Sequence, residues 1–124
     1  MENYQCHISI NNRTASKLIV QQSRVDWGQF MEKKSPAQID KKAQQPAFAA
    51  QGGSALAGTE GEVIYQFETD ANLTLRIYWN IPTRPGSSNE VTAKTSHSDL
   101  AAVVEGFKGS GSTEVCTIKL VDGR

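Results

Sequence analysis

The chain has 124 residues, of which 38% are hydrophobic, and its 13 Lys and Arg residues balance 13 Asp and Glu residues. This length is typical of a single domain with a sizeable core. The zero formal charge excludes the basic excess that is typical of proteins that bind nucleic acids or are steered onto anionic membranes.

Turn signals recur about every 8–12 residues, which is the rhythm of an all-β sandwich or barrel. In the first half, an Asn-rich turn at residues 11–14 and a turn at residues 26–28 separate alternating segments, and residues 33–36 read as a loop. The strands expected there are residues 4–10, 18–22, 37–40 and 47–50.

The second half centres on a hairpin. Residues 51–61 are rich in Gly, Ser and Ala and predict a long loop, which precedes a strand at residues 63–67. After a turn at residues 69–72, a second strand ends at residues 77–82 and leads into a loop at residues 85–89. The remaining expected strands are residues 89–95, 99–107 and 112–121.

A helix is an alternative for residues 100–105, with Asp99 as its cap, but Val103, Val104 and the flanking glycines favour a strand. The sequence therefore predicts an all-β fold. We expect one antiparallel β-sandwich domain over residues 1–124, with about eight or nine short strands.

The two cysteines are expected to point into the core. Cys6 has the parity of Ile8, and Cys116 has the parity of Ile118, so each thiol shares the inward face of its strand. Two buried free thiols are the favoured interpretation. A disulfide between the first and last strands and a reactive or metal-binding thiol are the alternatives, although no CxxC motif is present.

Candidate catalytic groups do not converge in this sequence. His7 lies on the outward face of its strand, and His97 with Asp99 forms a pair without a third partner. The glycines at residues 52–54 and 106–111 lack the strand-to-helix context of a phosphate-binding loop. We therefore expect a protein that is not an enzyme, with no catalytic residue, cofactor or metal site.

Residues 32–42 hold the only local concentration of positive charge. Glu32 and Asp40 are interspersed with the basic residues, which favours a solvated loop. A contact surface for anionic headgroups or for a protein partner is the alternative. The lysines concerned are Lys33, Lys34, Lys41 and Lys42.

Trp27 and Trp79 are expected in different environments. Trp27 precedes Gly28 in a turn, where an indole ring can dock at a membrane interface or, alternatively, fold back over the end of the sandwich. Trp79 has the parity of Ile77 at the end of its strand, which predicts packing at the rim of the core.

Tyr78 has the opposite parity to Trp79 and is expected outside the core. We hypothesise that it lines a polar pocket of headgroup size together with Tyr65, Arg84 and the loop at residues 87–89. The candidate lipid- or membrane-binding residues are Trp27, Tyr78, Trp79, Arg84, Ser87 and Asn89.

Taken in order, these motifs resemble the aegerolysin family over nearly the whole chain. The strand and Asn-rich turn at residues 8–12 come first, followed by the Trp-Gly pair at residues 27–28. The Gly-Thr-Glu-Gly motif at residues 58–61, the Tyr-Trp-Asn-Ile-Pro segment at residues 78–82 and the Gly-Ser-Ser-Asn loop at residues 86–89 complete the match. The resemblance implies a compact β-sandwich that binds membrane lipids.

Within that family the chain is most similar to the small component of bacterial two-component insecticidal crystal proteins, because of its motif at residues 58–61 with Tyr65 downstream. Fungal members that bind sphingolipids often carry a further Trp after the proline, where this chain has Thr83 and Arg84. The resemblance also implies a larger pore-forming partner protein. Family members are generally made without a signal peptide.

The start of the chain agrees with that implication, because residues 1–5 lack the charged and apolar regions of a secretory signal. The longest apolar run, residues 100–104, is far shorter than the roughly 20 residues of a transmembrane helix. We therefore expect a protein that is made in the cytoplasm, released, and active at the membrane of a target cell.

The resemblance implies membrane-lipid binding as one component of a pore-forming, insecticidal toxin. Self-association is compatible with that function, and no nucleic-acid partner is expected. Trp27 and the loop at residues 78–89 would enter the headgroup region. The alternatives are a carbohydrate-binding β-sandwich, in which Trp and Tyr stack on sugars, and a structural protein that packs into inclusions.

Overall fold

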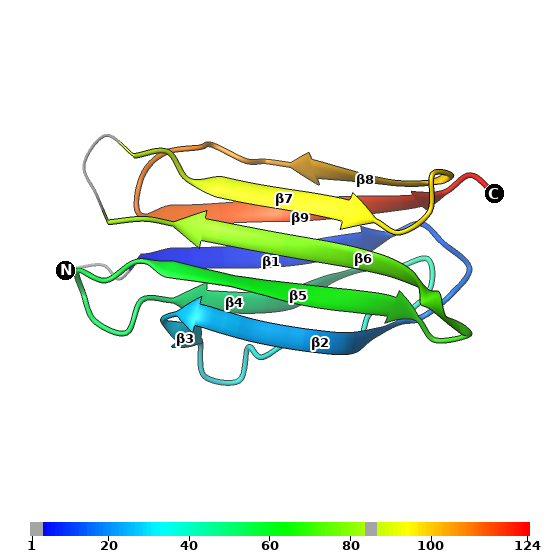
Figure 1. Cartoon of the computed structure of the whole chain (residues 1–124), viewed down its shortest axis with the longest axis horizontal. Coiled ribbons are helices and arrows are strands. Elements are labelled where there is room, and N and C mark those ends of the chain that lie inside the picture. The colour runs from blue at the N-terminus through cyan, green and yellow to red at the C-terminus, as the bar shows by residue number, and fades with distance from the viewer. Residues whose placement is uncertain (1–3, 84–86) are drawn as a thin grey trace.

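Nine β-strands are formed by the residues that the structure, a computed structural model, describes, namely 4–83 and 87–124 (Figure 1). In chain order they are β1 (Gln5–Asn12), β2 (Leu18–Trp27), β3 (Gln29–Phe30), β4 (Gln44–Gln51), β5 (Thr59–Phe67), β6 (Asp70–Ile81), β7 (Glu90–Thr95), β8 (Leu100–Glu105) and β9 (Thr113–Asp122). Within these described ranges, no helix is long and apolar enough to cross a membrane.

The strands form a five-stranded sheet of order β3-β4-β1-β9-β8 and a four-stranded sheet of order β2-β5-β6-β7. Figure 1 shows the two sheets stacked, with their strands along the long axis of the molecule. The predicted β-sandwich is confirmed. One pair departs from the antiparallel pattern, because β1 and β9 run parallel. Parallel neighbours need a long connection, and the first and last strands have the rest of the chain between them.

The core lies between the sheets and follows the alternation of the strands. In β1, Cys6, Ile8 and Ile10 are buried, while the residues between them are partly exposed. Trp79 of β6 is the largest fully buried side chain, and its ring centroid lies 5.2 Å from that of Phe48. Each fully buried side chain of this kind contributes about 1.5–3 kcal/mol.

The long loop predicted at residues 51–61 is shorter than expected, because only Gly58 of the Gly-Thr-Glu-Gly motif lies outside β5. Thr59 already begins β5 and pairs with Ile81, so cross-strand pairing extends the hairpin to its full length. Gly61 is required there, since a Cβ atom would lie 2.6 Å from two ring atoms of Trp79 and 2.4 Å from the Arg24 carbonyl oxygen. The glycine thus allows the close approach of a ring rather than a turn.

Two further expectations were wrong in detail. Residues 37–40 do not form a strand, since Ile39 makes only an isolated bridge to Leu18. The turn expected at residues 26–28 begins two residues late, because β2 includes Asp26 and Trp27 and only Gly28, with φ of 88°, leaves the strand. The strand expected over residues 100–105 is confirmed as β8, and the helix alternative is excluded.

Cys6 and Cys116 are free and buried, which confirms the favoured interpretation and excludes the disulfide. Burial raises the pKa of the Cys6 thiol, and the nearby Cys116 and Glu114 raise it further. Burial also raises the pKa of Cys116 to about 11, with a smaller contribution from the charge of Glu114. Both thiols are therefore protonated at neutral pH.

Neither cysteine of the folded protein is expected to react with maleimide at pH 7.5, because the thiolate is the reactive form and both thiols are inaccessible. In denaturant, where the thiol pKa returns to about 8.5, both should be labelled within minutes. Mass spectrometry after timed labelling counts the modified thiols. Rapid double labelling of the native protein would contradict this assignment.

Candidate functional site

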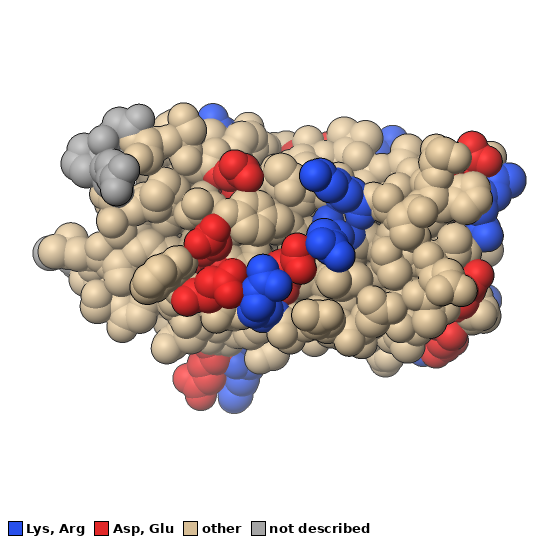
Figure 2. Space-filling model, in the orientation of Figure 1, with Lys and Arg blue, Asp and Glu red and all other residues tan. Residues whose placement is uncertain are grey.

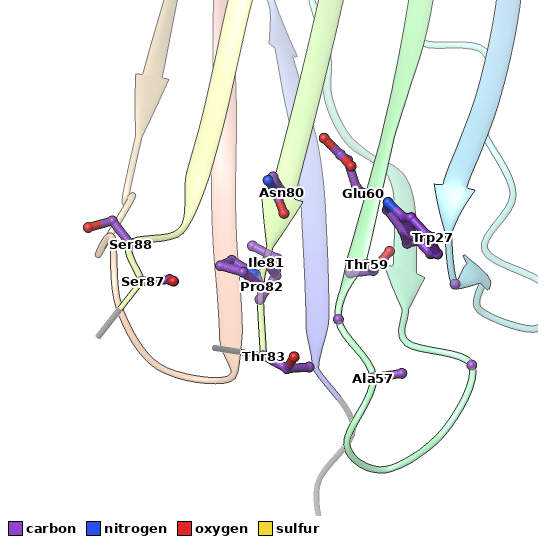
Figure 3. Close-up of a pocket in the computed structure, with 13 residues that line it drawn as sticks. Trp27, Ala57, Thr59, Glu60, Asn80, Ile81, Pro82, Thr83, Ser87 and Ser88 are labelled. Atoms are coloured by element: carbon purple, nitrogen blue, oxygen red, sulfur yellow. The ribbon is translucent and has the colours of Figure 1, made fainter. Parts of the chain in front are cut away.

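A hollow of about 850 Å³ lies at one end of the sandwich, where β2 and β6 end and β5 begins (Figure 3). We call it the end pocket. Its walls come from these three strand ends, from the loop at residues 52–58 and from the residues on either side of the undescribed segment 84–86. The lining residues are Trp27, Gly28, Gly53, Ala57, Gly58, Thr59, Glu60, Asn80, Ile81, Pro82, Thr83, Ser87 and Ser88.

Trp27 is the one aromatic residue among the described residues that line the end pocket, and 67% of its surface is accessible. It is the last residue of β2 and pairs with Glu60 of β5 after a register shift that begins at Val25. Gly28 then turns the chain away, and a Cβ atom at that position would lie 2.2 Å from the Gln51 carbonyl oxygen. The ring of Trp27 is therefore exposed and does not fold back over the core, and its docking at a membrane stays a prediction.

Glu60 brings a carboxylate to the end pocket, and Figure 3 shows it on the strand next to Trp27. The Tyr78 hydroxyl donates a hydrogen bond to Glu60 Oε2. Burial, followed by this hydrogen bond and the negative charges of Glu60 and Glu90, raises the pKa of Tyr78 to about 12. Tyr78 lies outside the core, as expected, but beside the lining of the end pocket, where it orients the carboxylate.

The outer face of the four-stranded sheet carries charges of both signs, as Figure 2 shows. Arg24 Nε lies 2.9 Å from Asp26 Oδ1, and Glu62 lies 3.6 Å from both Arg24 and Arg76. Exposed pairs of this kind add little to the stability of a protein, because water and salt screen them. Their main consequence is local neutrality, so this face offers no field that would attract an anionic surface.

Trp79 has no accessible surface and supports the end pocket from below. Its indole Nε1 donates a hydrogen bond to Thr59 Oγ1 at 3.0 Å, and its ring packs against Phe30 and Phe48. The predicted core packing is confirmed. Its assignment as a lipid-contacting residue is corrected, because the inward parity of β6 leaves no part of the ring for a ligand.

The candidate residues of the loop at residues 87–89 also differ in their exposure to the end pocket. Ser87 lines the end pocket, as expected. Asn89 is only 6% exposed, and its side-chain Nδ2 donates to Glu114 Oε2 at 2.8 Å and to the Gly111 carbonyl at 3.0 Å. Asn89 therefore ties loops together rather than facing a ligand. Arg84, the remaining candidate, lies outside the described residues.

Tyr65 does not belong to the end pocket, and its grouping with Tyr78 was wrong. It is fully buried, and its hydroxyl donates to the Ala37 carbonyl oxygen at 2.8 Å. Burial raises the pKa of this hydroxyl. Its neighbours of equal parity, Val63 and Phe67, are also core residues, and that alternation was the signal that would have placed it correctly.

The polar lining residues Glu60, Asn80 and Thr83 were missed from the sequence. Glu60 and Asn80 face each other across the β5–β6 hairpin, but a register shift between Gln66 and Phe67 means that counting outward from the turn would not have paired them. Sequence patterns alone gave no reason to place β2 and Trp27 beside that pair. Among the described residues, no group of three potential metal ligands is found.

Comparison with known proteins agrees with this architecture. The Aegerolysin family model matches residues 3–122. The RahU protein in complex with a TRIS molecule aligns with a TM-score of 0.76 and 18% identity, over 98% of this chain and 95% of that one. IP-1A from Alcaligenes faecalis aligns with a TM-score of 0.72 and 16% identity, over 99% and 95%.

A third solved structure, the lipid binding protein Nakanori, aligns with a TM-score of 0.75 and 14% identity, over 100% of this chain and 73% of that one. At these identities the structural likeness concerns the fold. A search of curated protein sequences found no match. The family model, by contrast, spans the strands from β1 to β9 and both loops of the end pocket, and on that basis the chain belongs to the aegerolysin family.

Proposed function

We propose that this protein binds membrane lipids through the end pocket, with Trp27 inserted among the headgroups. The observation that carries the proposal is the 67% exposed indole beside a hollow of about 850 Å³ that also holds Glu60, Asn80 and Ser87. Indole rings favour the interfacial zone of a bilayer, because they are apolar with one polar N–H group. The family membership and the lipid binding protein Nakanori support the same function.

A second apolar anchor accompanies Trp27. Leu56 is 69% exposed and lies on the loop at residues 52–58, whose Ala57 and Gly58 line the end pocket. Burying both side chains contributes about 4 kcal/mol, which corresponds to a dissociation constant near 1 mM. Stable attachment at lower concentration therefore requires several copies that bind together, since linked contacts multiply in affinity.

A more specific form of this proposal is that the protein is one component of a two-component toxin. In it, this chain supplies lipid recognition without catalysis, and a larger partner protein forms the pore, with an insect cell as the target. Production in the cytoplasm and later release belong to this proposal. The chain's resemblance to the small components of bacterial two-component insecticidal proteins supports it.

Replacing Trp27 with Ala is expected to weaken binding to susceptible membranes about 30-fold, which is the loss of about 2 kcal/mol of burial. Co-sedimentation with liposomes of varied headgroup, including sphingolipid and cholesterol, measures the affinity at physiological salt. Val103→Ala is the matched control, because Val103 is 52% exposed on β8, away from the end pocket.

Equal binding by wild-type and Trp27→Ala proteins would contradict the proposed site. Inhibition of cell binding by free sugars, combined with indifference to lipid composition, would favour a carbohydrate-binding function instead. An absence of binding to every lipid and sugar would favour the structural alternative.

A further inference from the structure

A second hollow, of about 430 Å³, lies on the outer face of the five-stranded sheet. We call it the side pocket. Its base is formed by β1 and β4, where His7 pairs with Ala49. Its wall is the segment at residues 33–37, which follows β3 and projects from the side of the sandwich (Figure 1). No residue of the side pocket also lines the end pocket.

The wall of the side pocket is held in place by backbone hydrogen bonds. Met31 N donates to the Ala49 carbonyl at 2.9 Å, and Ala49 N donates to the Lys34 carbonyl at 3.0 Å. Ala37 N donates to the Ala47 carbonyl at 2.9 Å, which anchors the other end of the segment. Ala49 is consequently only 2% exposed, although its partner His7 is on the outer face. A site fixed in this way loses little entropy when a ligand binds.

The groups around the side pocket are cationic or can donate hydrogen bonds. Lys33, Lys34, Ser35, His7 and Ser9 contribute to the lining, and no carboxylate does. In the turn from Met31 to Lys34, Lys33 has a φ of 61°. Such a conformation is uncommon for a residue with a side chain, and here the hydrogen bond from Lys34 N to the Met31 carbonyl holds it.

The pKa of His7 depends on the charges around the side pocket. Burial and the positive charge of Lys34 lower its pKa. Its Nε2 lies 2.8 Å from Gln5 Oε1, an acceptor, which assigns the ring hydrogen to Nε2 and leaves Nδ1 open. The in-register neighbours of His7 on the adjoining strands are the uncharged Ala49 and Val115. Glu32 precedes the lysines but does not line the hollow.

We propose that the side pocket binds a phosphate ester, with Lys33 and Lys34 contacting the phosphate and the serine hydroxyls donating to it or to an adjoining hydroxyl group. The hollow is several times larger than a phosphate group, so a polyol phosphate such as glycerol phosphate or inositol phosphate suits it better than the bare ion. Lysine binds phosphate as a compact point charge. The end pocket, with Glu60 in its lining, is unsuited to the same ligand.

The two histidines of the chain allow a direct test by proton NMR. A bound anion favours imidazolium, so saturating glycerol 3-phosphate or inositol 1-phosphate is expected to raise the pKa of His7 by about 1 unit. By linkage, the contribution of His7 to the affinity should strengthen as the pH falls through this pKa, whereas the ligand loses its second negative charge near about pH 6. His97, in the turn before β8, is the internal control and should not respond.

Lys33→Gln/Lys34→Gln is expected to weaken binding about 10-fold and to abolish the His7 response. Lys41→Gln/Lys42→Gln is the matched control, because it removes the same charge from a neighbouring exposed turn that does not line the side pocket. Thermal melting of both variants checks that the fold is retained. An unchanged His7 pKa, an equal response of His97, or equal losses in both variants would each overturn the proposal.

A second arm identifies the source of the phosphate. Vesicles of phosphatidylcholine with and without a phosphoinositide are tested by co-sedimentation, using the Trp27→Ala background so that the end pocket contributes little. Phosphoinositide-dependent binding that requires the two lysines points to a lipid headgroup. A His7 response to soluble esters without vesicle binding points to a free metabolite, and either result supports the side pocket independently of the end pocket's function.

Discussion

Replacing Trp79 with Ala is expected to lower the free energy of unfolding by about 3–5 kcal/mol, the range for removing a large aromatic side chain from a core. The ring has no accessible surface, and it packs at 5.2 Å and 6.0 Å, between centroids, from Phe48 and Phe30. Its loss leaves a cavity at the end of the core. This change is a large fraction of the 5–15 kcal/mol that stabilises a typical domain.

Urea unfolding followed by circular dichroism measures this effect, and Trp27→Ala is its matched control. Because Trp27 is exposed, its removal should change the free energy of unfolding by no more than about 0.5 kcal/mol. Trp79 should also emit at shorter wavelength than Trp27, which the two single-Trp proteins will show. Comparable destabilisation by both substitutions would contradict the assignment of one tryptophan to the core and one to the surface.

Replacing Glu114 with Ala is expected to destabilise the protein by about 3 kcal/mol, because one buried and two partly buried donors lose their acceptor. The side chain has no accessible surface, and Oε1 accepts from Lys108 N at 3.0 Å. Oε2 accepts from Gly109 N and from Asn89 Nδ2, both at 2.8 Å. This carboxyl group therefore joins the start of β9 to the loop before it and to the loop that lines the end pocket.

Hydrogen exchange separates this effect from a general loss of stability. The amide protons of Lys108 and Gly109 should exchange faster in Glu114→Ala than global unfolding accounts for. Glu114→Gln retains one acceptor oxygen and should fall between wild type and Ala. Glu105→Ala is the control, since Glu105 is exposed at the end of β8. Unchanged exchange at both amides would show that the carboxyl group does not hold the loop.

Local patterns determined much of this fold. A period of two placed Cys6, Cys116 and Trp79 on inward faces, because residues two apart along a strand share one side of a sheet. Turn residues marked the β5–β6 hairpin, and β-branched residues distinguished β8 from a helix. These signals act between residues close in sequence, so they can be read without knowing the fold. The error at Tyr65 came from setting aside the same alternation.

Only the tertiary structure decided how distant segments meet. The parallel pairing of β1 with β9, the contact of Asn89 with Glu114 and the meeting of Trp27 with Glu60 each join residues that no local pattern relates. Composition suggested loops at residues 51–61 and 33–36, but the hydrogen bonds that extend β5 and fix the segment at residues 33–37 come from other strands. Both pockets depend on such pairings, because a hollow exists only where separate elements are held at a fixed distance by the core beneath them.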